Sequence, residues 1–327
     1  MASTMPSERF GSAASATTES ATSLDQRLWY GRVPVVFSLH ASEVTTLHAP
    51  RPFYAMIPRM SYLVAQTRDV VEYFRDAAPP FGGLQGASIW FEAKSVPLKW
   101  HLPVGVLWDV LCGGDVESAV LPWQITVHFQ GFPHDELLPC ENEKSVEVHF
   151  MHSLKQATFL RSGSTKVIMG MPEAQQSQIW TSVTSSTLFL TGSSWMREAL
   201  TSQEPRSANI VVWPADDFQS YRVATRDLQL DHEDVVSASN MRMIPIRVHL
   251  NQEPAIQMPI TPLANDQEEK TLGDVLSYLL PDVFPSEDCA IIVHGIRVPR
   301  DVSLLSLYRS FAYADGFLYV SVVPQQP

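Results

Sequence analysis

The sequence predicts an α+β protein in which two similar modules of mixed strands and helices flank a helix-rich region. Two observations support this fold class. Short β-rich runs and amphipathic segments follow one another in the same order near both ends of the chain, and the residues between them have mainly helical spacing. The predicted organisation is a tail at 1–26, a first module at 27–138, a helix-rich domain at 139–238 and a second module at 239–327.

The first 26 residues predict a disordered tail. They are rich in serine, alanine and threonine and have almost no apolar periodicity, which is typical of segments that do not fold. A transit peptide is the alternative that this composition suggests. The acidic residues Glu8, Glu19 and Asp25 oppose it because such presequences avoid acids. We therefore expect ordered structure to begin near Arg27.

The first module begins with two β-rich runs, at 32–39 and 52–59, which predict a hairpin with a long connection. Residues 61–77 then change to helical period and predict one long helix. A second hairpin-like pair follows at 88–93 and 97–102, then a short helix and a final strand. The recurring residues of the long helix are Leu63, Val64, Thr67, Val70, Val71 and Phe74, and the last two elements are expected at 104–112 and 123–130.

The second module repeats this order of elements. Residues 243–250 and 255–260 predict a hairpin, and 271–281 predict a helix with Thr271 as N-cap and Pro281 as its stop. Residues 289–298 predict two strands turning at Gly295, followed by a short helix at 303–311 and a closing strand at 317–324.

A mixed sheet around one main helix is the topology of a ubiquitin-like β-grasp domain, so we expect two such domains. The chain ends in Val-Val-Pro-Gln-Gln-Pro, whereas transferable ubiquitin-like modifiers end in Gly-Gly. We therefore expect that neither domain is donated to another protein.

The region between the modules contains one strongly patterned helix, which includes HFMHSLKQATFL at 149–160. Its apolar residues follow 4-4-3 spacing and predict a buried stripe. Successive residues turn by about 100°, which places Lys155 about 40° beyond Met151, at the edge of the stripe. The stripe consists of Val146, Phe150, Leu154 and Ala157.

Two further helices are predicted in this region, at 174–183 and 216–230. The segment from Thr184 to Pro214 between them contains serines, glycine and prolines, and it predicts an exposed loop insertion.

The composition excludes several classes of function. A net charge of −12 and a pI near 5.2 argue against a nucleic-acid-binding protein, because phosphate recognition needs a basic surface. Cys112, Cys140 and Cys289 are far apart and form no Cys-x-x-Cys pair, which favours a reducing cytosolic environment over a zinc or redox centre. No apolar stretch is long enough to predict a membrane span.

Two other kinds of chemistry are considered from the residue types. Cys112 with His101 or His128 could form a thiol hydrolase, since a cysteine nucleophile needs a base, but Cys112 ends an apolar helix, where cysteine usually packs as a small hydrophobe. His149 and His152 are spaced for half a metal site but lack further ligands nearby in the sequence. We therefore expect no catalytic residues, metal or cofactor.

The aromatic and basic residues of the first module allow two interpretations. Four tryptophans are expected mainly in its core: Trp90, Trp100, Trp108 and Trp123. Arg51, Lys94 and Lys99 are candidates for a surface that meets a partner protein or an anionic lipid, and the sequence favours neither.

Several motifs, in this order, resemble the autophagy-related protein five family, most closely its plant and algal forms. They are SIWFEAKSVPLKWHLPVGVLWDVLCGG, LPWQITVHFQGFP, LLPCENEKSVEVHFMHSLKQA and the ending GIRV…FLYVSVVPQ. The resemblance extends from about Arg27 to Pro327 and is interrupted mainly by the insertion at 184–214. It implies two ubiquitin-like domains around a helix-rich one.

The resemblance also implies a function. Lys155, in the HFMHSLKQA motif and supported by Phe150, Met151 and Leu154, would receive the C-terminal glycine of the ubiquitin-like autophagy protein twelve in an isopeptide bond. An amine attacks a thioester only when neutral, and a free lysine is neutral in about one molecule in a few thousand at pH 7. Apolar cover from Met151, Phe159 and a conjugating enzyme would favour that form. His152 and Gln156 could orient the amine or be merely solvated.

The family's partners follow from the same resemblance. They are the covalent modifier, the coiled-coil autophagy protein sixteen, a transient E2-like conjugating enzyme and, peripherally, the preautophagosomal membrane. The resulting cytoplasmic complex would act like a ubiquitin ligase in attaching autophagy protein eight to phosphatidylethanolamine during autophagosome formation. The alternative is an interaction module with ubiquitin-like folds that is never conjugated.

Overall fold

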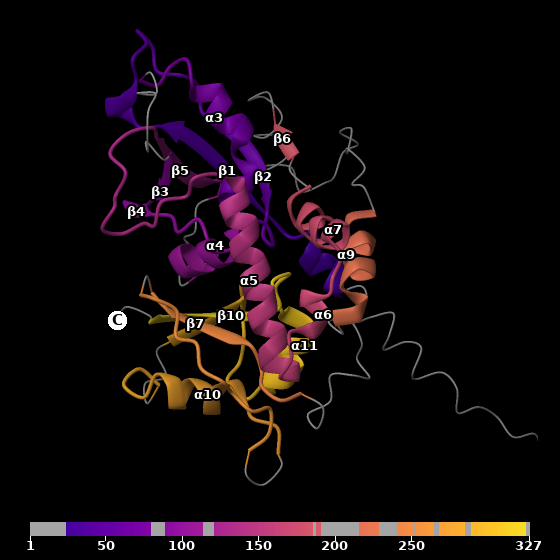
Figure 1. The fold of residues 1–327 in the computed structure, drawn as a ribbon. Helices are drawn as coiled ribbons and strands as arrows, with labels where there is room; N and C mark the ends of the chain where they lie inside the picture. Colours follow the sequence, from indigo (N-terminus) through magenta and orange to yellow (C-terminus); the bar gives the residue numbers. More distant parts are fainter. Residues whose placement is uncertain are drawn as a thin grey trace, which may run out of the picture.

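The computed structural model describes residues 24–79, 89–113, 121–185, 188–190, 216–228, 241–251, 253–264, 268–284 and 289–324. It contains two β-sheets, which lie at opposite ends of the molecule with a long central helix running past both (Figure 1). The predicted fold class is therefore confirmed: two mixed modules with β-grasp topology flank a helix-rich region. None of the described helices is both long and apolar enough to cross a bilayer.

The first sheet has β1 near its centre, parallel to β5 and antiparallel to β2. Parallel pairing of the first and last strands of the module is the defining feature of the β-grasp arrangement. The sheet order is β4 (Val96–Pro97), β3 (Trp90–Ala93), β5 (Trp123–His128), β1 (Arg32–Leu39), β2 (Phe53–Pro58) and β6 (Leu188–Leu190).

The second sheet repeats this arrangement, with its first strand parallel to its last. Its order is β7 (Ile246–Leu250), β10 (Leu318–Pro324), β8 (Cys289–Val293) and β9 (Ile296–Arg297). The module's helices are α10 (Leu272–Leu279) and α11 (Leu304–Phe311). Thr271 caps α10 as predicted, because its hydroxyl accepts from the Asp274 N–H while the Asp274 carboxylate accepts from the Thr271 N–H.

The prediction of one continuous helix at 61–77 is wrong. The segment consists of α2 (Leu63–Gln66) and α3 (Arg68–Phe74), separated at Thr67, where φ is −114° and ψ is 9°. The Thr67 hydroxyl donates to the Val64 carbonyl oxygen at 3.4 Å. Such side-chain bonds compete with the helical hydrogen bonds of the backbone.

Two predicted strands are also shorter than expected. In the first module the hairpin forms, but its second strand is only β4, and residues 98–102 are not extended into the sheet. In the second module 255–260 forms no regular strand and pairs only through isolated bridges, Ile244 with Ile260 and Val248 with Ile256. Pro254 and Pro259 flank Ile256 and supply no N–H to a ladder.

The helix-rich region is dominated by α5 (Glu143–Ser162). Helices were predicted at the positions of α7 and α9, and both are confirmed. The other helices of this region and of the first module are α4 (Val104–Cys112), α6 (Lys166–Met169), α7 (Glu173–Thr184) and α9 (Asp216–Thr225), with 3-10 turns η1 (Ala41–Glu43) and η3 (Arg226–Leu228).

Two segments differ from the sequence-based expectation at the edges of this region. Residues 24–29 are helical, so ordered structure begins before Arg27, and Trp29 packs on Phe218 and Tyr221 of α9 with ring centroids 5.8 and 4.6 Å away. The segment predicted as a loop insertion contributes β6, an edge strand on β2, because Leu188–Leu190 is a short apolar run suited to sheet pairing. Most of that segment and the predicted tail at 1–23 lie outside the described residues.

The buried core of the first module continues through the middle region without a break. It includes Phe37 and Ile125 from the sheet, Phe150 and Leu154 from α5, and Phe317 from the second module. The second module also has a core of its own around α10 and β10. The three regions are therefore packed together through apolar contact and not merely linked in sequence.

Candidate functional site

Helix α5 is fixed at both ends by local hydrogen bonds. The Asn142 side chain accepts from the Ser145 N–H at 3.2 Å at its start, which satisfies one of the free donors of a helix N-terminus. Gly163 ends it in the left-handed region, with φ of 76°, and its N–H donates to the Phe159 carbonyl at 2.7 Å. The helix therefore has defined ends.

The buried face of α5 is the one predicted from its spacing. All four stripe residues are fully buried, and Met151 is buried beside them. The Phe150 ring contacts Tyr62 and Trp180 with centroids 6.1 and 5.5 Å away, so the helix packs between the first module and α7. The three residues proposed to support the lysine, Phe150, Met151 and Leu154, thus belong to the core.

Lys155 is half-buried and lies on the outer edge of this helix. Positions one turn before and after it are Met151, which is buried, and Phe159, which is 51% exposed. Val148 and His152, also exposed, share this face at helical spacing. Within the described part of the chain the Lys155 ammonium has no hydrogen bond or ion pair, whereas Lys144 pairs with Glu147 at 2.8 Å. Lys155 is thus an unpaired amine in a partly apolar surface.

Arg247 on β7 connects this helix to the second module. Its Nη2 donates to Ser153 Oγ and to Gln156 Oε1, both at 3.3 Å, and its Nη1 donates to Tyr319 Oη at 2.7 Å. The buried Asp315 carboxylate lies 3.6 Å from Nη1. Burial raises the pKa of Asp315, and the Arg247 guanidinium opposes that shift. Gln156 is therefore not simply solvated, because it is held next to Lys155 by an arginine of the second module.

A second polar contact joins the two ubiquitin-like modules directly. Asp109 of α4 accepts from Arg59 Nη2 at 2.5 Å through one oxygen and from the Gly295 N–H at 3.0 Å through the other. Arg59 Nη2 also donates to the Gly105 carbonyl at 3.2 Å. Both charged side chains are nearly buried, and a buried carboxylate is tolerated when it is paired in this way.

Three histidines from three regions gather at the same junction. His101 and His149 have ring centroids 5.3 Å apart, and His249 of β7 lies close enough to His101 and Lys99 for their charges to act on it. Burial lowers the pKa of each of these histidines to about 4, with smaller contributions from neighbouring cationic groups. The junction therefore holds these three rings in their neutral form near pH 7.

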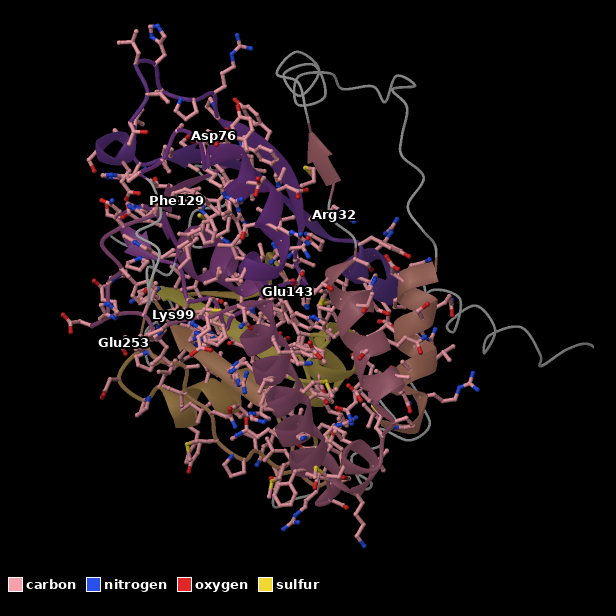
Figure 2. All side chains as sticks on the ribbon, turned by 45° about the horizontal axis from the view of Figure 1, so that its top comes forward. Arg32, Asp76, Lys99, Phe129, Glu143 and Glu253 are labelled. Carbon is pink, nitrogen blue, oxygen red and sulfur yellow. The ribbon has the colours of Figure 1, made fainter. Side chains whose placement is uncertain are left out.

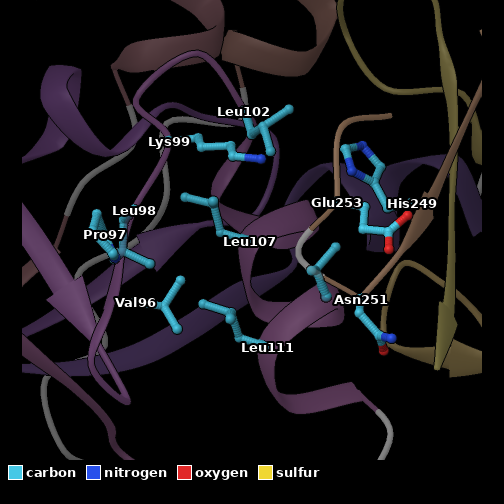
Figure 3. Close-up of a pocket in the computed structure, with 11 residues that line it drawn as sticks. Val96, Pro97, Leu98, Lys99, Leu102, Leu107, Leu111, His249, Asn251 and Glu253 are labelled. Carbon is cyan, nitrogen blue, oxygen red and sulfur yellow. The ribbon is translucent and has the colours of Figure 1, made fainter. Parts of the chain in front are cut away.

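A small pocket opens between the two modules at this junction, and Figure 3 shows its lining. One wall comes from β4, α4 and the segment between them, and the other from the end of β7. Figure 3 places Lys99 and Glu253 on opposite sides of the pocket, and Figure 2 labels the same two residues close to each other in the whole molecule. The apolar wall consists of Val96, Pro97, Leu98, Leu102, Leu107, Val110 and Leu111.

The structure does not assemble the thiol hydrolase considered from sequence. Cys112 is buried, and burial raises its thiol pKa, which disfavours the reactive thiolate. His128 contacts Glu43, and His101 contacts His149. These residues therefore belong to separate surroundings.

The tryptophans and basic residues also have defined places. Trp90 and Trp123 are core residues as predicted, whereas Trp100 and Trp108 are only half-buried. Lys94 donates to the Leu111 carbonyl at 3.1 Å, and Lys99 lines the pocket. Sequence reasoning missed Arg247, because a lone arginine in a strand gives no signal of its distant partners.

Comparison with known proteins agrees with this architecture. The chain matches the family models described as Autophagy protein ATG5, UblA domain, over residues 28–129, alpha-helical bundle region over 143–188, and UblB domain over 243–322. Together these models span most of the chain, and they fall on the first sheet, on α5 with α7, and on the second sheet.

The relatives differ in how much of the chain they match and in how similar they are to it. "Autophagy protein 5" of Oryza sativa subsp. indica is 43% identical over 158 residues, 48% of this chain and 40% of that protein, so the match spans less than half of the plant relative. The protein of the same name from Phaeosphaeria nodorum is 27% identical over 324 residues and matches 92% of this chain and 96% of its own length.

A solved structure has the same fold. The crystal structure of Kluyveromyces marxianus Atg5 covers 92% of this chain and 99% of its own, with a TM-score of 0.67 and 20% sequence identity. Taken with the three family models, these matches show that the chain belongs to the autophagy protein 5 family.

Proposed function

We propose that this chain is an autophagy scaffold that is conjugated through Lys155 to the ubiquitin-like autophagy protein twelve. The conjugate, with the coiled-coil autophagy protein sixteen, would act as an E3-like complex that promotes lipidation of autophagy protein eight with phosphatidylethanolamine. Membership of the family supports the role in autophagy. The setting of Lys155 on α5 is the observation that carries the acceptor role.

Lys155 meets the physical requirements of an isopeptide acceptor. Lys155 is half-buried and its amine is unpaired within the described residues, and the exposed Phe159, one turn later, and Val148, two turns earlier, lie on the same face of the helix. A conjugating enzyme that covers this apolar face would remove water from the amine, which favours the neutral, nucleophilic form. Phe150, Met151 and Leu154 are buried core residues, so the helix backbone that carries Lys155 has a fixed position.

In this proposal the chain is a non-catalytic acceptor. It needs no cofactor, and the thioester is supplied by an E2-like enzyme that binds transiently. The domains proposed are 27–138, 139–238 and 239–327, and the place of action is the cytoplasm and the periphery of the preautophagosomal membrane. No nucleic-acid partner is proposed, in keeping with the net charge of −12.

We place the coiled-coil partner in the groove between the ubiquitin-like modules. The pocket there combines an apolar wall from the first module with Lys99 and Glu253 at its sides. An amphipathic helix binds such a groove by burying its apolar face. The pocket residues do not include Lys155, so docking and conjugation would use separate surfaces.

The test is reconstituted conjugation with the modifier, its activating enzyme and its E2-like enzyme. Wild-type protein should give a band that survives denaturation, and Lys155→Arg should give none, because arginine stays charged and cannot attack a thioester. Lys144→Arg and Lys166→Arg are matched controls on neighbouring exposed lysines and should conjugate normally. Mass spectrometry should find the isopeptide on Lys155.

Two outcomes would contradict the proposal. An isopeptide on Lys144 or Lys166 with Lys155 unmodified would refute the residue assignment. A chain that binds the modifier but never shifts on a denaturing gel would support the alternative of a non-conjugated interaction module. Capture of the coiled-coil partner should be equal for wild type and Lys155→Arg, and its loss in the folded variant would refute separate surfaces.

A further inference from the structure

A group of possible metal ligands lies in the first module, away from α5. His40, Glu43 and His128 each offer a ligand atom, and these atoms all lie within 4.8 Å of one another. Among the residues that the structure describes, this is the one such group of three. The parallel pairing of β1 with β5 creates it: Leu39 pairs with Val127, so the residues that follow, His40 and His128, lie side by side with ring centroids 4.6 Å apart.

The Glu43 carboxylate points into this group from η1 although it is only 6% exposed. Its Oε2 accepts from the Phe129 N–H at 2.6 Å, and its Oε1 lies 3.2 Å from His128 Nδ1. Two ligands of a tetrahedral zinc ion, with bonds of about 2.0 to 2.1 Å, are about 3.3 Å apart. Glu43 Oε1 and His128 Nδ1 therefore already have the separation that a shared ion requires.

The surroundings of His128 also suit a metal ligand. Its ring is nearly buried and stacks on Trp90 with a centroid distance of 3.8 Å and an interplanar angle of 8°. The second ring nitrogen, Nε2, has no hydrogen-bond partner among the described residues and lies 3.4 Å from Glu92 Oε2. Metal-bound histidines usually direct their other N–H toward a carboxylate, which fixes the tautomer, and Glu92 lies where that carboxylate is needed.

His40 would complete the ligand set from the solvent side. It is half-buried, and Ser42 Oγ lies 2.8 Å from its Nδ1, a contact that restrains the ring. Imidazole nitrogens with one carboxylate suit zinc and its neighbours, whereas magnesium and calcium prefer oxygen ligands. The half-exposed side leaves room for a water molecule as the fourth ligand.

We propose that His40, Glu43 and His128 form a binding site for a divalent transition-metal ion of the zinc class. Each histidine supplies one ring nitrogen, Glu43 supplies Oε1, and Glu92 orients His128 from behind. The bound ion would replace the hydrogen bond between Glu43 and His128 and would tie η1 to the end of the sheet. This site is independent of the proposed conjugation at Lys155.

Titration calorimetry of the full, tag-free, chelator-treated chain with zinc chloride tests the proposal. We expect one equivalent of zinc to bind with micromolar or tighter affinity. His40→Gln should weaken binding at least tenfold, and because His40 is half-exposed the metal-free variant should still fold. His134→Gln removes an exposed histidine of the same module and should leave the affinity unchanged.

Two further measurements separate a metal site from a structural hydrogen-bonded pair. Zinc should raise the melting temperature of wild type and His134→Gln but not of His40→Gln, since a ligand stabilises only the state that binds it. Cobalt(II) should give the visible absorption of a four-coordinate site in wild type, and the variant should lack it. No saturable binding, or equal binding in His40→Gln, would overturn the proposal.

Discussion

Leu154 and Gln156 lie two positions apart on α5 but have different surroundings. Leu154 is fully buried, whereas Gln156 is exposed and accepts from Arg247 Nη2. Leu154→Asp loses about 1.5 to 3 kcal/mol of apolar burial and adds the cost of an unpaired buried carboxylate. We expect the melting temperature to fall by roughly 10 °C or more. Gln156→Asp should change it little, because a carboxylate there meets water and a guanidinium. Equal melting temperatures in circular dichroism would contradict the rotation assigned to α5.

At this scale, spacing predicted burial better than it predicted polar partners. The 4-4-3 pattern gave the buried stripe and the edge position of Lys155, because helix geometry is local. The contacts of Gln156 with Arg247 and of His40 with His128 join residues far apart in sequence, so no local pattern contains them. The motif first singled out Lys155 as the acceptor, and its half-buried position at the edge of the stripe supports that proposal.

At the scale of elements, the two modules use the same short hairpin with different turn residues. The turn of β3 and β4 has φ of 52° at Lys94 and 61° at Ser95, and that of β8 and β9 has 51° at His294 and 77° at Gly295. A residue other than glycine raises the free energy of the folded state by about 1 to 2 kcal/mol when it adopts the left-handed region. Glycine avoids this cost, but it loses more conformational entropy on folding, which offsets part of the difference.

Exchanging the two turn residues tests this comparison. Ser95→Gly should stabilise the protein by about 0.5 to 1 kcal/mol, and Gly295→Ser should destabilise it by about 1 kcal/mol. A Cβ at position 295 would meet Arg59 atoms no closer than 3.4 Å, so the cost is conformational and not steric. Urea unfolding midpoints would measure both changes. A loss of stability in Ser95→Gly would show that Ser95 is not under strain.

Elements defined by a clear period were predicted, and those that depend on context were not. Helices α4, α5, α7, α10 and α11 and the main strands follow their patterns. The break at Thr67 accompanies the hydrogen bond of its own hydroxyl to Val64, and 255–260 is interrupted by Pro259 and preceded by Pro254; the apolar period contains neither feature. Gln66, beside the break, also has a tertiary contact, since it is buried and its amide donates to the Thr184 carbonyl at 2.7 Å.

For the whole molecule, the order of the three regions was predictable but their mutual packing was not. The repeated order of elements revealed two modules. Besides the shared apolar core, their contacts include single polar pairs, Asp109 with Gly295 and Arg247 with Ser153, which bring distant parts of the chain together. The molecule therefore has a polar junction that fixes both modules against α5, beside the proposed partner groove.

This junction should make the stability of the whole molecule depend on pH through its three histidines. His101, His149 and His249 have pKa values lowered to about 4 by burial, compared with about 6.5 in an unfolded chain. Between these values the unfolded chain binds more protons than the folded one, so the free energy of unfolding rises with pH. The stabilisation is complete above about pH 6.5 and is lost as the pH falls toward 4.

His249→Phe isolates the most buried of the three. It keeps an aromatic ring beside Tyr319, whose ring stacks on His249 at 6.0 Å, and removes Nε2, a buried nitrogen without a hydrogen-bond partner among the described residues. Urea unfolding from pH 7 to 5, above the usual titration of carboxylates, should show a shallower loss of stability in His249→Phe than in wild type. His134→Gln, which changes an exposed histidine, should keep the wild-type slope. The same slope in all three proteins would mean that protonation of His249 does not couple to unfolding. A shallower slope in His249→Phe alone would locate the acid sensitivity at the junction that holds the second module against the rest of the chain.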